Sequence, residues 1–278
     1  LIVDPDPEIT ITGSSTGSTY YDTPTNFSDL LVNNDNEVHS VRYHFIPSIS
    51  PEDGGIDCGN GQDTTITIWV NPTPVINVSI PDTVFCNNEI TDFLIEDGLG
   101  NVMGEKKFII YAQYNINDVS VYERDFDPDT LNVGTIVADS LVNLVNETEE
   151  ISYFFRAIIE DTREGYNRDC KDGTDTTIKI FVQPTPRFTA EISETIICDS
   201  TEIEIDVTHH MDYIAFADNM YSLETDYNAG ALTGIQAEGD YGAGADIEDL
   251  LDNLTDTIQD VSYRMMARLY DNRPGHEG

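Results

Sequence analysis

The feature that most constrains this chain is a motif that occurs three times at a fixed distance along its 278 residues. Tyr43, Tyr153 and Tyr263 are spaced by 110 residues, and each lies in a short apolar run. Fourteen residues before each tyrosine stands an aspartate, with Leu two and Asn four positions after it: Asp29, Leu31 and Asn33; Asp139, Leu141 and Asn143; Asp249, Leu251 and Asn253. Self-similarity at a fixed spacing is typical of repeat architectures. The sequence therefore predicts repeated units of about 110 residues.

A second block recurs at a spacing of 112 residues. Residues 63–74, which read Asp-Thr-Thr-Ile-Thr-Ile-Trp-Val-Asn-Pro-Thr-Pro, match residues 175–186, and a partial first copy is expected at residues 2–7. The two extra residues fall between Tyr153 and Cys170, where a loop can absorb them. The first unit is short, because Pro7 precedes Tyr43 by 36 residues whereas Pro74 precedes Tyr153 by 79. The sequence leaves open whether this unit is naturally short or incomplete.

Short runs with alternating apolar residues predict β-strands with one buried face. Such runs lie around each repeated tyrosine and at residues 66–70, 76–80, 93–95, 108–111, 178–182 and 203–207, separated by clusters of Gly, Asn, Asp and Pro. Residues 249–254 are expected to form one short helical turn. About seven short strands in 110 residues is the size of an immunoglobulin-like sandwich. We therefore predict an all-β chain of tandem immunoglobulin-like (PKD-like) sandwiches arranged end to end.

The Pro-x-Pro segments mark the expected boundaries between the units. Two alternate prolines favour an extended backbone and cannot donate hydrogen bonds there, so they predict a short, semi-rigid connection. The expected units are residues 1–72, a partial or shortened first repeat; 73–184, a complete second repeat; and 185–278, a third repeat truncated before its last strand. Because the sequence begins at Leu1 without a leader and ends inside the pattern, we expect it to be part of a longer chain.

Composition excludes several classes of function. The net charge of −39 opposes binding to nucleic acid, whose phosphates are bound mainly by Lys and Arg, and to anionic membrane surfaces. An apolar content of 39% favours folded domains. The sequence contains no run of 18 apolar residues, so it predicts no segment that spans a membrane. Motifs of nucleophilic, zinc-dependent or phosphate-binding enzymes are absent from the sequence, so we expect no enzyme activity and no cofactor.

Four cysteines recur in register, with Cys58 matching Cys170 and Cys86 matching Cys198. Repeated cysteines in an acidic β protein favour disulfides and an oxidising compartment, although buried free thiols are the alternative. Strand order places Cys58 and Cys170 near the N-terminal pole of their sandwiches, and Cys86 and Cys198 near the C-terminal pole. One hypothesis is that each C-terminal cysteine pairs with a cysteine of the following unit.

Three carboxylates at alternate positions, Asp125, Asp127 and Asp129, are the candidate metal site. Calcium prefers several hard oxygen ligands around one point, which a turning loop with this spacing can supply. The Gly and Glu of an EF-hand loop are missing, and a solvated acidic loop is the alternative.

The order of these motifs resembles the PKD-like repeats of very large secreted proteins of the Bacteroidota, among them the gliding-motility surface adhesins exported by the type IX system. The PKD signature Trp-Asp-Phe-Gly-Asp-Gly is absent from this sequence. The resemblance implies an extracellular, cell-surface location, with neighbouring repeats, surface polysaccharide or an outer-membrane anchoring complex as partners. It also implies O-glycosylation at Asp-Ser/Thr-apolar tripeptides, of which the candidates are Thr83, Thr130, Ser140 and Thr257.

Two functions follow from this reading. The first is a structural and adhesive segment of a very large surface filament, with gliding motility as the specific role. The alternative is a carbohydrate-binding or spacer module of a secreted polysaccharide-degrading enzyme. A binding module of that kind would expose several aromatic side chains on one face, and Trp69 is the only tryptophan in the chain.

Overall fold

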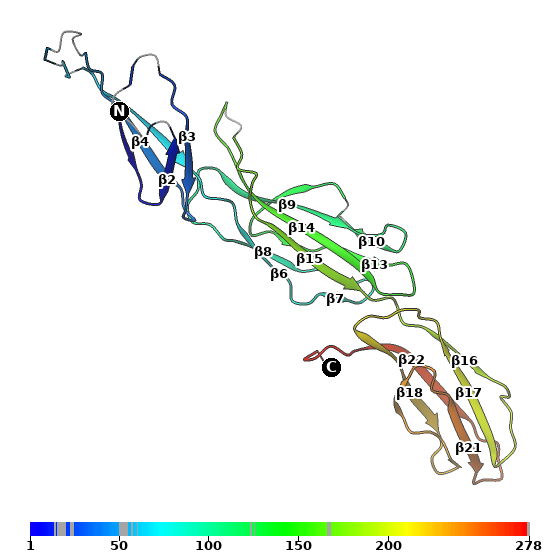
Figure 1. The fold of residues 1–278 in the computed structure, drawn as a ribbon. Helices are drawn as coiled ribbons and strands as arrows, with labels where there is room; N and C mark the ends of the chain where they lie inside the picture. Colours follow the sequence, from blue (N-terminus) through cyan, green and yellow to red (C-terminus); the bar gives the residue numbers. More distant parts are fainter. Residues whose placement is uncertain are drawn as a thin grey trace.

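The computed structural model describes residues 1–13, 15, 21–22, 25–49, 55–56, 58–59, 61–122, 124, 126–165 and 168–276. These residues form strands β1 to β22 and no α-helix, and hence no helix that could cross a bilayer was found among them. The strands fall into three groups that follow one another along an elongated molecule (Figure 1). No strand pairing joins one group to another in the part described. We name these groups the first unit (β1–β5), the second unit (β6–β15) and the third unit (β16–β22).

The second unit is a sandwich of two sheets. Its strands are β6 (Ile76–Ser79), β7 (Val84–Phe85), β8 (Phe93–Asp97), β9 (Glu105–Gln113), β10 (Val119–Tyr122), β11 (Asp129–Asn132), β12 (Ile136–Val137), β13 (Ser140–Asn143), β14 (Glu149–Glu160) and β15 (Asp175–Val182). One sheet has the order β11-β9-β14-β15-β7, in which β7 runs parallel to β15. The facing strands are β12-β8-β6 and β10-β13. This strand order is that of an immunoglobulin-like sandwich.

Alternating side chains from both sheets fill the space between them. Phe93, Phe108, Tyr153 and Phe155 are almost completely buried, and the ring centroids of Phe93 and Tyr153 are 4.6 Å apart. Strand β14 shows the predicted period of two, because Ile151, Tyr153 and Phe155 point inward while residues between them are partly exposed. The strands predicted around residues 76–80, 93–95, 108–111 and 203–207 are confirmed.

The third unit has the same order with fewer strands. They are β16 (Phe188–Ile192), β17 (Thr201–His209), β18 (Ala217–Tyr227), β19 (Leu232–Thr233), β20 (Gly239–Gly242), β21 (Ile247–Asn253) and β22 (Val261–Asp271). The sheets are β16-β17-β21-β19 and β20-β18-β22, around a core that contains Tyr221, Leu223 and Ile247. Residues 249–254 therefore lie mostly in β21, and the predicted helical turn was wrong. Their alternating burial is the strand pattern that the interpretation overlooked.

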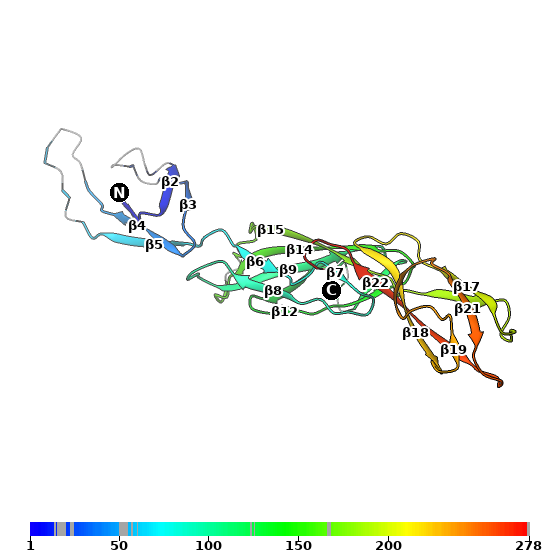
Figure 2. The same ribbon diagram turned by 90° about the horizontal axis from the view of Figure 1, so that it is seen from below.

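The first unit contains β1 (Ile2–Pro5), β2 (Ile9–Gly13), β3 (Asp29–Asn33), β4 (His39–Phe45) and β5 (Thr64–Val70). Its sheets are β1-β4-β5 and β2-β3, and a small core forms around Ile9, Val41 and Tyr43. Figure 2 shows this unit at one end of the molecule, with β4 and β5 leading toward the second unit.

The interpretation of residues 2–7 as a copy of the Pro-x-Pro block was wrong. Val3 of β1 pairs with Tyr43, whereas Ala112 of β9 pairs with Tyr153, so β1 takes the place of β9. Pro7 then lies in the turn between β1 and β2 rather than at a boundary between units. Pro7 precedes Tyr43 by only 36 residues because it lies in this turn and not at the start of the unit. A turn accepts Pro-x-Pro as readily as a connection between sandwiches does.

Candidate functional site

The repeated aspartate and tyrosine meet across the core. Tyr43 donates a hydrogen bond from its hydroxyl to Asp29 Oδ2 over 2.9 Å, and Tyr263 donates to Asp249 Oδ2 over 2.5 Å. Burial first, and then the hydrogen bond to Asp29, raise the pKa of Tyr43 to about 12. Asp249 is 2% exposed, so a hydroxyl partner offsets part of the cost of burying its charge. The pair thus has a structural role in linking the two sheets.

In the second unit the repeated aspartate, Asp139, is bound by an arginine. Arg124 and Asp139 are 8% and 2% exposed, and Arg124 Nε lies 3.3 Å from Asp139 Oδ2. Arg124 also donates from Nη1 to Asp129 Oδ2 over 2.5 Å. Burial, followed by the charge of Asp139, raises the pKa of Tyr153. Arg124 was not singled out from the sequence, because the aligned repeats offer no arginine with which to compare it.

The repeated asparagine joins the turn after its strand to the last strand of the sheet. Asn143 Nδ2 donates to Glu147 O over 2.7 Å and to Val182 O over 2.8 Å. Asn33 makes the equivalent bonds to Glu37 O and Val70 O, over 2.6 and 2.9 Å. In each case the asparagine side-chain oxygen also accepts a backbone N–H two residues later, from Asp35 or Val145. Short side-chain amides suit such turns.

The junction between the first and second units is formed by the turn after β3, the end of β5 and the loop after β8. Val38 N donates to Asn101 O over 2.8 Å, and Gly100 N donates to Asn36 O over 2.9 Å. Asn71 then forms two bonds with the backbone of residue 103, donating to its carbonyl over 2.9 Å and accepting from its N–H over 2.8 Å. The connection is therefore an interface and not only a short linker.

The junction between the second and third units uses the equivalent positions. Thr148 N donates to Tyr213 O over 2.9 Å, and Asp212 N donates to Asn146 O over 3.0 Å. Gln183, which stands where Asn71 stands in the repeat, donates to the carbonyl of residue 215 over 2.5 Å. From the first junction to the second, the residues of the turn lie 110 positions further along the chain and those of the loop 112 positions further. The two junctions therefore share one pattern of backbone hydrogen bonds.

Additional side chains reinforce the second junction. Arg273, at the end of the third unit, binds Asp82 of the second unit with both Nη atoms, over 2.6 and 2.9 Å. Hydrogen bonding to Arg273 lowers the pKa of Asp82 well below its usual range. The rings of Phe181 and Phe216 meet edge to face with centroids 4.8 Å apart. The two units are thus held by polar, ionic and aromatic contacts.

The four cysteines are free thiols in this structure, and their positions agree with the expected poles for the second unit. Cys170 Sγ lies 4.0 Å from Asn71 Nδ2, next to the first unit. Cys86 lies toward the third unit, because the charge of Asp271 contributes, after burial and Glu89, to raising its thiol pKa. These two cysteines therefore face opposite neighbours. Disulfide formation at Cys58, Cys86, Cys170 and Cys198 stays a prediction.

The acidic loop proposed for calcium is described only in part. Asp125 lies outside the described residues, and Asp129 is paired with Arg124. Asp127 is exposed. Elsewhere in the described chain, three potential ligands come within 4.8 Å of one another in each of two groups: Asp82, Asp271 and His276; and Glu204, Asp206 and Asp246. In the first group Arg273 already supplies the positive charge.

The candidate glycosylation sites differ in accessibility. Thr83, Thr130 and Thr257 are exposed, whereas Ser140 is half-buried and pairs with Tyr122 within the β10–β13 sheet. A glycan needs an accessible hydroxyl, so Ser140 is the least suitable of the four.

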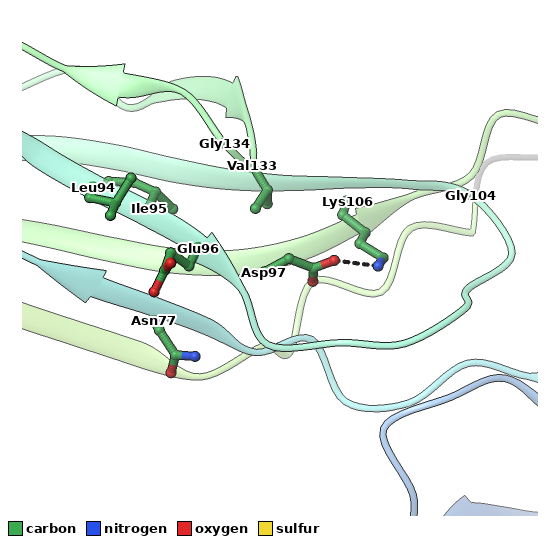
Figure 3. A pocket seen from close by; sticks show the side chains of 9 residues that line it. All are labelled: Asn77, Leu94, Ile95, Glu96, Asp97, Gly104, Lys106, Val133 and Gly134. Atoms are coloured by element: carbon green, nitrogen blue, oxygen red, sulfur yellow. Dashed lines mark hydrogen bonds and ion pairs between the residues drawn. The ribbon is translucent and has the colours of Figure 1, made fainter.

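A shallow hollow of about 800 Å³ opens on the second unit between β6, β8 and β9 (Figure 3). Lys106 forms an ion pair with Asp97 across its rim and donates to Leu99 O over 3.0 Å. The nine residues that line the hollow, all of them described, include no Ser, Cys or His. Its two carboxylates are Glu96 and Asp97, of which Asp97 is paired with Lys106.

Comparison with known proteins identified no family: no family model matches the chain, and no curated protein matches it. Among solved structures, the chain is similar to the Escherichia coli adhesin FdeC, at 13% identity over 90% of this chain and 78% of that one, with a TM-score of 0.33. It is also similar to the D00-D0 domain of intimin, at 11% identity over 71% of this chain and all of that one, with a TM-score of 0.31. A Salmonella alpha-2-macroglobulin matches 100% of this chain with 20% of its own, at 10% identity and a TM-score of 0.26. The fold follows from the strand order of the chain itself, which is all-β and immunoglobulin-like.

Proposed function

We propose that this chain is a segment of an extended, adhesive filament at the cell surface, built from immunoglobulin-like sandwiches that dock through one repeated junction. The proposed units are residues 1–72, 73–184 and 185–278, and neighbouring repeats of the same chain are the first partners. Gliding motility is the specific role we assign, with surface polysaccharide or an outer-membrane anchoring complex as further partners.

The observation that carries this proposal is the equivalence of the two junctions. Both use the backbone of the turn after the repeated asparagine and the backbone of the loop of the next unit. Both add the amide side chain that follows the last strand, Asn71 or Gln183. A junction that is repeated in this way propagates one orientation from unit to unit, as in other linear repeat proteins.

The net charge of −39 fits the same role. Like charges along a filament oppose its collapse and its association with copies of itself. Calcium at the acidic loop, disulfides between units and O-glycans at exposed threonines would each stiffen or protect an extracellular rod, and we keep them as parts of the proposal.

Small-angle X-ray scattering of the whole chain tests the extended arrangement. Strand β14 has 12 residues, which at about 3.3 Å per residue gives a unit length of about 40 Å and about 120 Å for three units. A rod of this length has a radius of gyration of about 35 Å, against about 19 Å for a compact domain of this size. A measured value near the compact figure would contradict the proposal.

A junction variant tests whether the contacts hold this orientation. Replacing Thr148 and Gln183 by Ala removes the hydrogen bonds that connect them to residue 215. We expect faster amide exchange at residues 211–216 and a broader distribution of interatomic distances in scattering. Thr130→Ala, at an exposed position away from the junction, is the matched control. Equal exchange in the variant and the control would show that these two side chains do not hold the junction.

The carbohydrate-binding alternative predicts an aromatic surface on one unit. Exposed aromatic side chains are instead spread over all three units: Trp69, Tyr122, Phe126, Tyr213, Phe216, Tyr227 and Tyr270. A glycan array separates the two functions, because saturable binding of one sugar class by the chain would favour the binding module. Adhesion of beads coated with the chain to glass and to polysaccharide films, without a preferred sugar, supports the filament.

A further inference from the structure

We infer that a protonated histidine holds the first junction in place, so that the contact between the first and second units weakens as this histidine loses its proton. His39 lies between two carboxylates, directly behind the turn that binds the second unit. The inference concerns the control of one junction by pH. It does not depend on the adhesive role proposed for the chain.

The position of the His39 ring is the first observation. His39 begins β4, and the period of a strand places its side chain on the same face as Val41 and Tyr43, at the end of the core. The side chain is 22% exposed. Its Nε2 lies 2.9 Å from Asp35 Oδ2, in the turn after β3, and its Nδ1 lies 3.6 Å from Asp6 Oδ2, in the turn between β1 and β2. The ring therefore connects two turns of the first unit.

This arrangement requires a positive charge on the ring. A neutral imidazole has one N–H donor and one lone pair, whereas an ionised carboxylate only accepts. Because both ring nitrogens of His39 face a carboxylate, the neutral form directs a lone pair at an anion. The hydrogen bond to Asp35 is the main cause that raises the pKa of His39 above its ordinary value of 6.5. Burial opposes this effect, and the charges of Asp35 and Asp6 add to it.

Both carboxylates keep their charge while the histidine titrates. Ser40 N donates to Asp6 Oδ2 over 2.7 Å, and this bond is the main cause that lowers the pKa of Asp6. The pKa of Asp35 is lowered first by the hydrogen bond from His39, and then by the bond from Asn36 N to Asp35 Oδ1 over 2.7 Å. The proton that is lost as the pH rises is therefore that of the histidine.

The other neighbours of the ring leave this balance unchanged. Val70 of β5, an apolar residue, lies opposite His39. Glu37, the second acidic residue of the turn, packs its side chain against Gly100 of the second unit. In the described part of the chain, the two aspartates are thus the charged groups that act on the ring.

The turn that His39 closes is the one that forms the junction. Asn36 O accepts a hydrogen bond from the loop of the second unit over 2.9 Å, and Val38 N donates one to it over 2.8 Å. Both residues lie between Asp35 and His39, so the contact between these two side chains spans the segment that docks. Loss of the charge releases the start of this turn, and the two backbone bonds then lose part of their support.

The second junction differs at the same positions. Val145 stands where the first unit has Asp35, and Glu149 stands where it has His39. Burial, followed by the charges of two neighbouring carboxylates, raises the pKa of Glu149. The two junctions share a backbone pattern, but this histidine contact belongs to the first one.

The direction of the pH dependence follows from the raised pKa. The stabilisation by His39 is fully present below the unfolded value of 6.5 and is lost as the pH rises through the higher folded value. NMR of the whole chain tests this, with amide exchange rates at pH 6 and pH 8 divided by the intrinsic rate at each pH. We expect the protection of the Val38 and Gly100 amides to fall several-fold at pH 8. The His39 ring signals should titrate with a midpoint above 6.5.

Three variants separate charge from packing. His39→Gln should show the weak protection of Val38 and Gly100 at both pH values, whereas His39→Lys, which keeps a positive charge, should show the strong protection at both. His44→Gln is the matched control, because His44 lies in the same strand with its Nδ1 2.9 Å from Thr65 Oγ1 instead of a carboxylate. This control should keep the pH response of the unchanged chain.

Three results would overturn the inference: a His39 midpoint at or below 6.5, protection of Val38 and Gly100 that does not change with pH, or an unchanged pH response in His39→Gln. The first two are measured on the unchanged chain, so they decide the matter even where a variant fails to fold. A compact scattering profile, by contrast, bears only on the proposed function.

Discussion

Replacement of Asn143 by Ala is a quantitative test of how the repeated motif stabilises a unit. The side chain is 6% exposed and makes three hydrogen bonds, to Glu147 O, Val182 O and Val145 N. At about 1 kcal/mol for each bond, the loss is about 3 kcal/mol, since the buried carbonyl of Val182 gains no partner in exchange. The second unit should lose this free energy of unfolding.

The matched variant is Asn253→Ala. Asn253 has the same place in the motif and bonds to Thr257 O and Thr255 N, but these bonds are exposed. Water can replace exposed partners, so we expect a loss of about 1 kcal/mol or less in the third unit. The difference between the two variants isolates the bond to the last strand from the bonds within the turn.

Hydrogen exchange followed by mass spectrometry over a urea series is the suitable assay, because three units need not unfold in one step. Peptides that cover β13 to β15 should exchange roughly 100-fold faster in Asn143→Ala, which corresponds to about 3 kcal/mol. In Asn253→Ala, the exchange rate of peptides that cover β21 and β22 should rise less than tenfold. If Asn143→Ala costs no more than Asn253→Ala, the bond to Val182 does not stabilise the sandwich, and the reasoning fails.

Three further predictions follow. Arg124→Met should lower the free energy of unfolding of the second unit by about 3–5 kcal/mol, because it leaves the charge of Asp139 buried without its partner. Hydrogen exchange over a urea series measures this loss, and adding Asp139→Asn should restore part of it. The pKa of Asp82 is lowered by Arg273, so its stabilisation of the second junction is present above the unfolded value of 3.8 and is lost as the pH falls through the lower folded value. NMR titration should show Asp82 still ionised at pH 3.8, and Arg273→Met should raise its midpoint. Burial raises the pKa of the Cys86 and Cys170 thiols. Iodoacetamide at pH 8 should therefore modify these two cysteines more slowly than Cys58 and Cys198.

The fold was largely predictable because its signals are local and repeated. Alternating runs predicted the main strands, and the spacing of the tyrosines predicted three equivalent positions in the cores. The two errors also have local causes. Pro7 suits a turn as well as a connection between units. Residues 249–254 were predicted as a helical turn although most of them follow the alternation of β21.

The junctions were not predictable from single residues. Their hydrogen bonds are mainly between backbone atoms, which leave no side-chain signature in a sequence. The usable signal was the pair of offsets, 110 for the turn and 112 for the loop, but only the structure shows that these two segments touch. Arg124 was missed for a different reason, since its partner Asp139 is shared by all repeats while the arginine is not.

The parallel pairing of β7 with β15 has a consequence for a molecule that is stretched. Tension enters the second unit near its first strands and leaves through β15, so these two strands are pulled in opposite directions along their length. The hydrogen bonds between β7 and β15 lie across the direction of the force, so they must break together rather than one after another. A sandwich loaded in shear in this way yields slowly, and its lifetime under load is set by the unfolding rate rather than by the equilibrium stability.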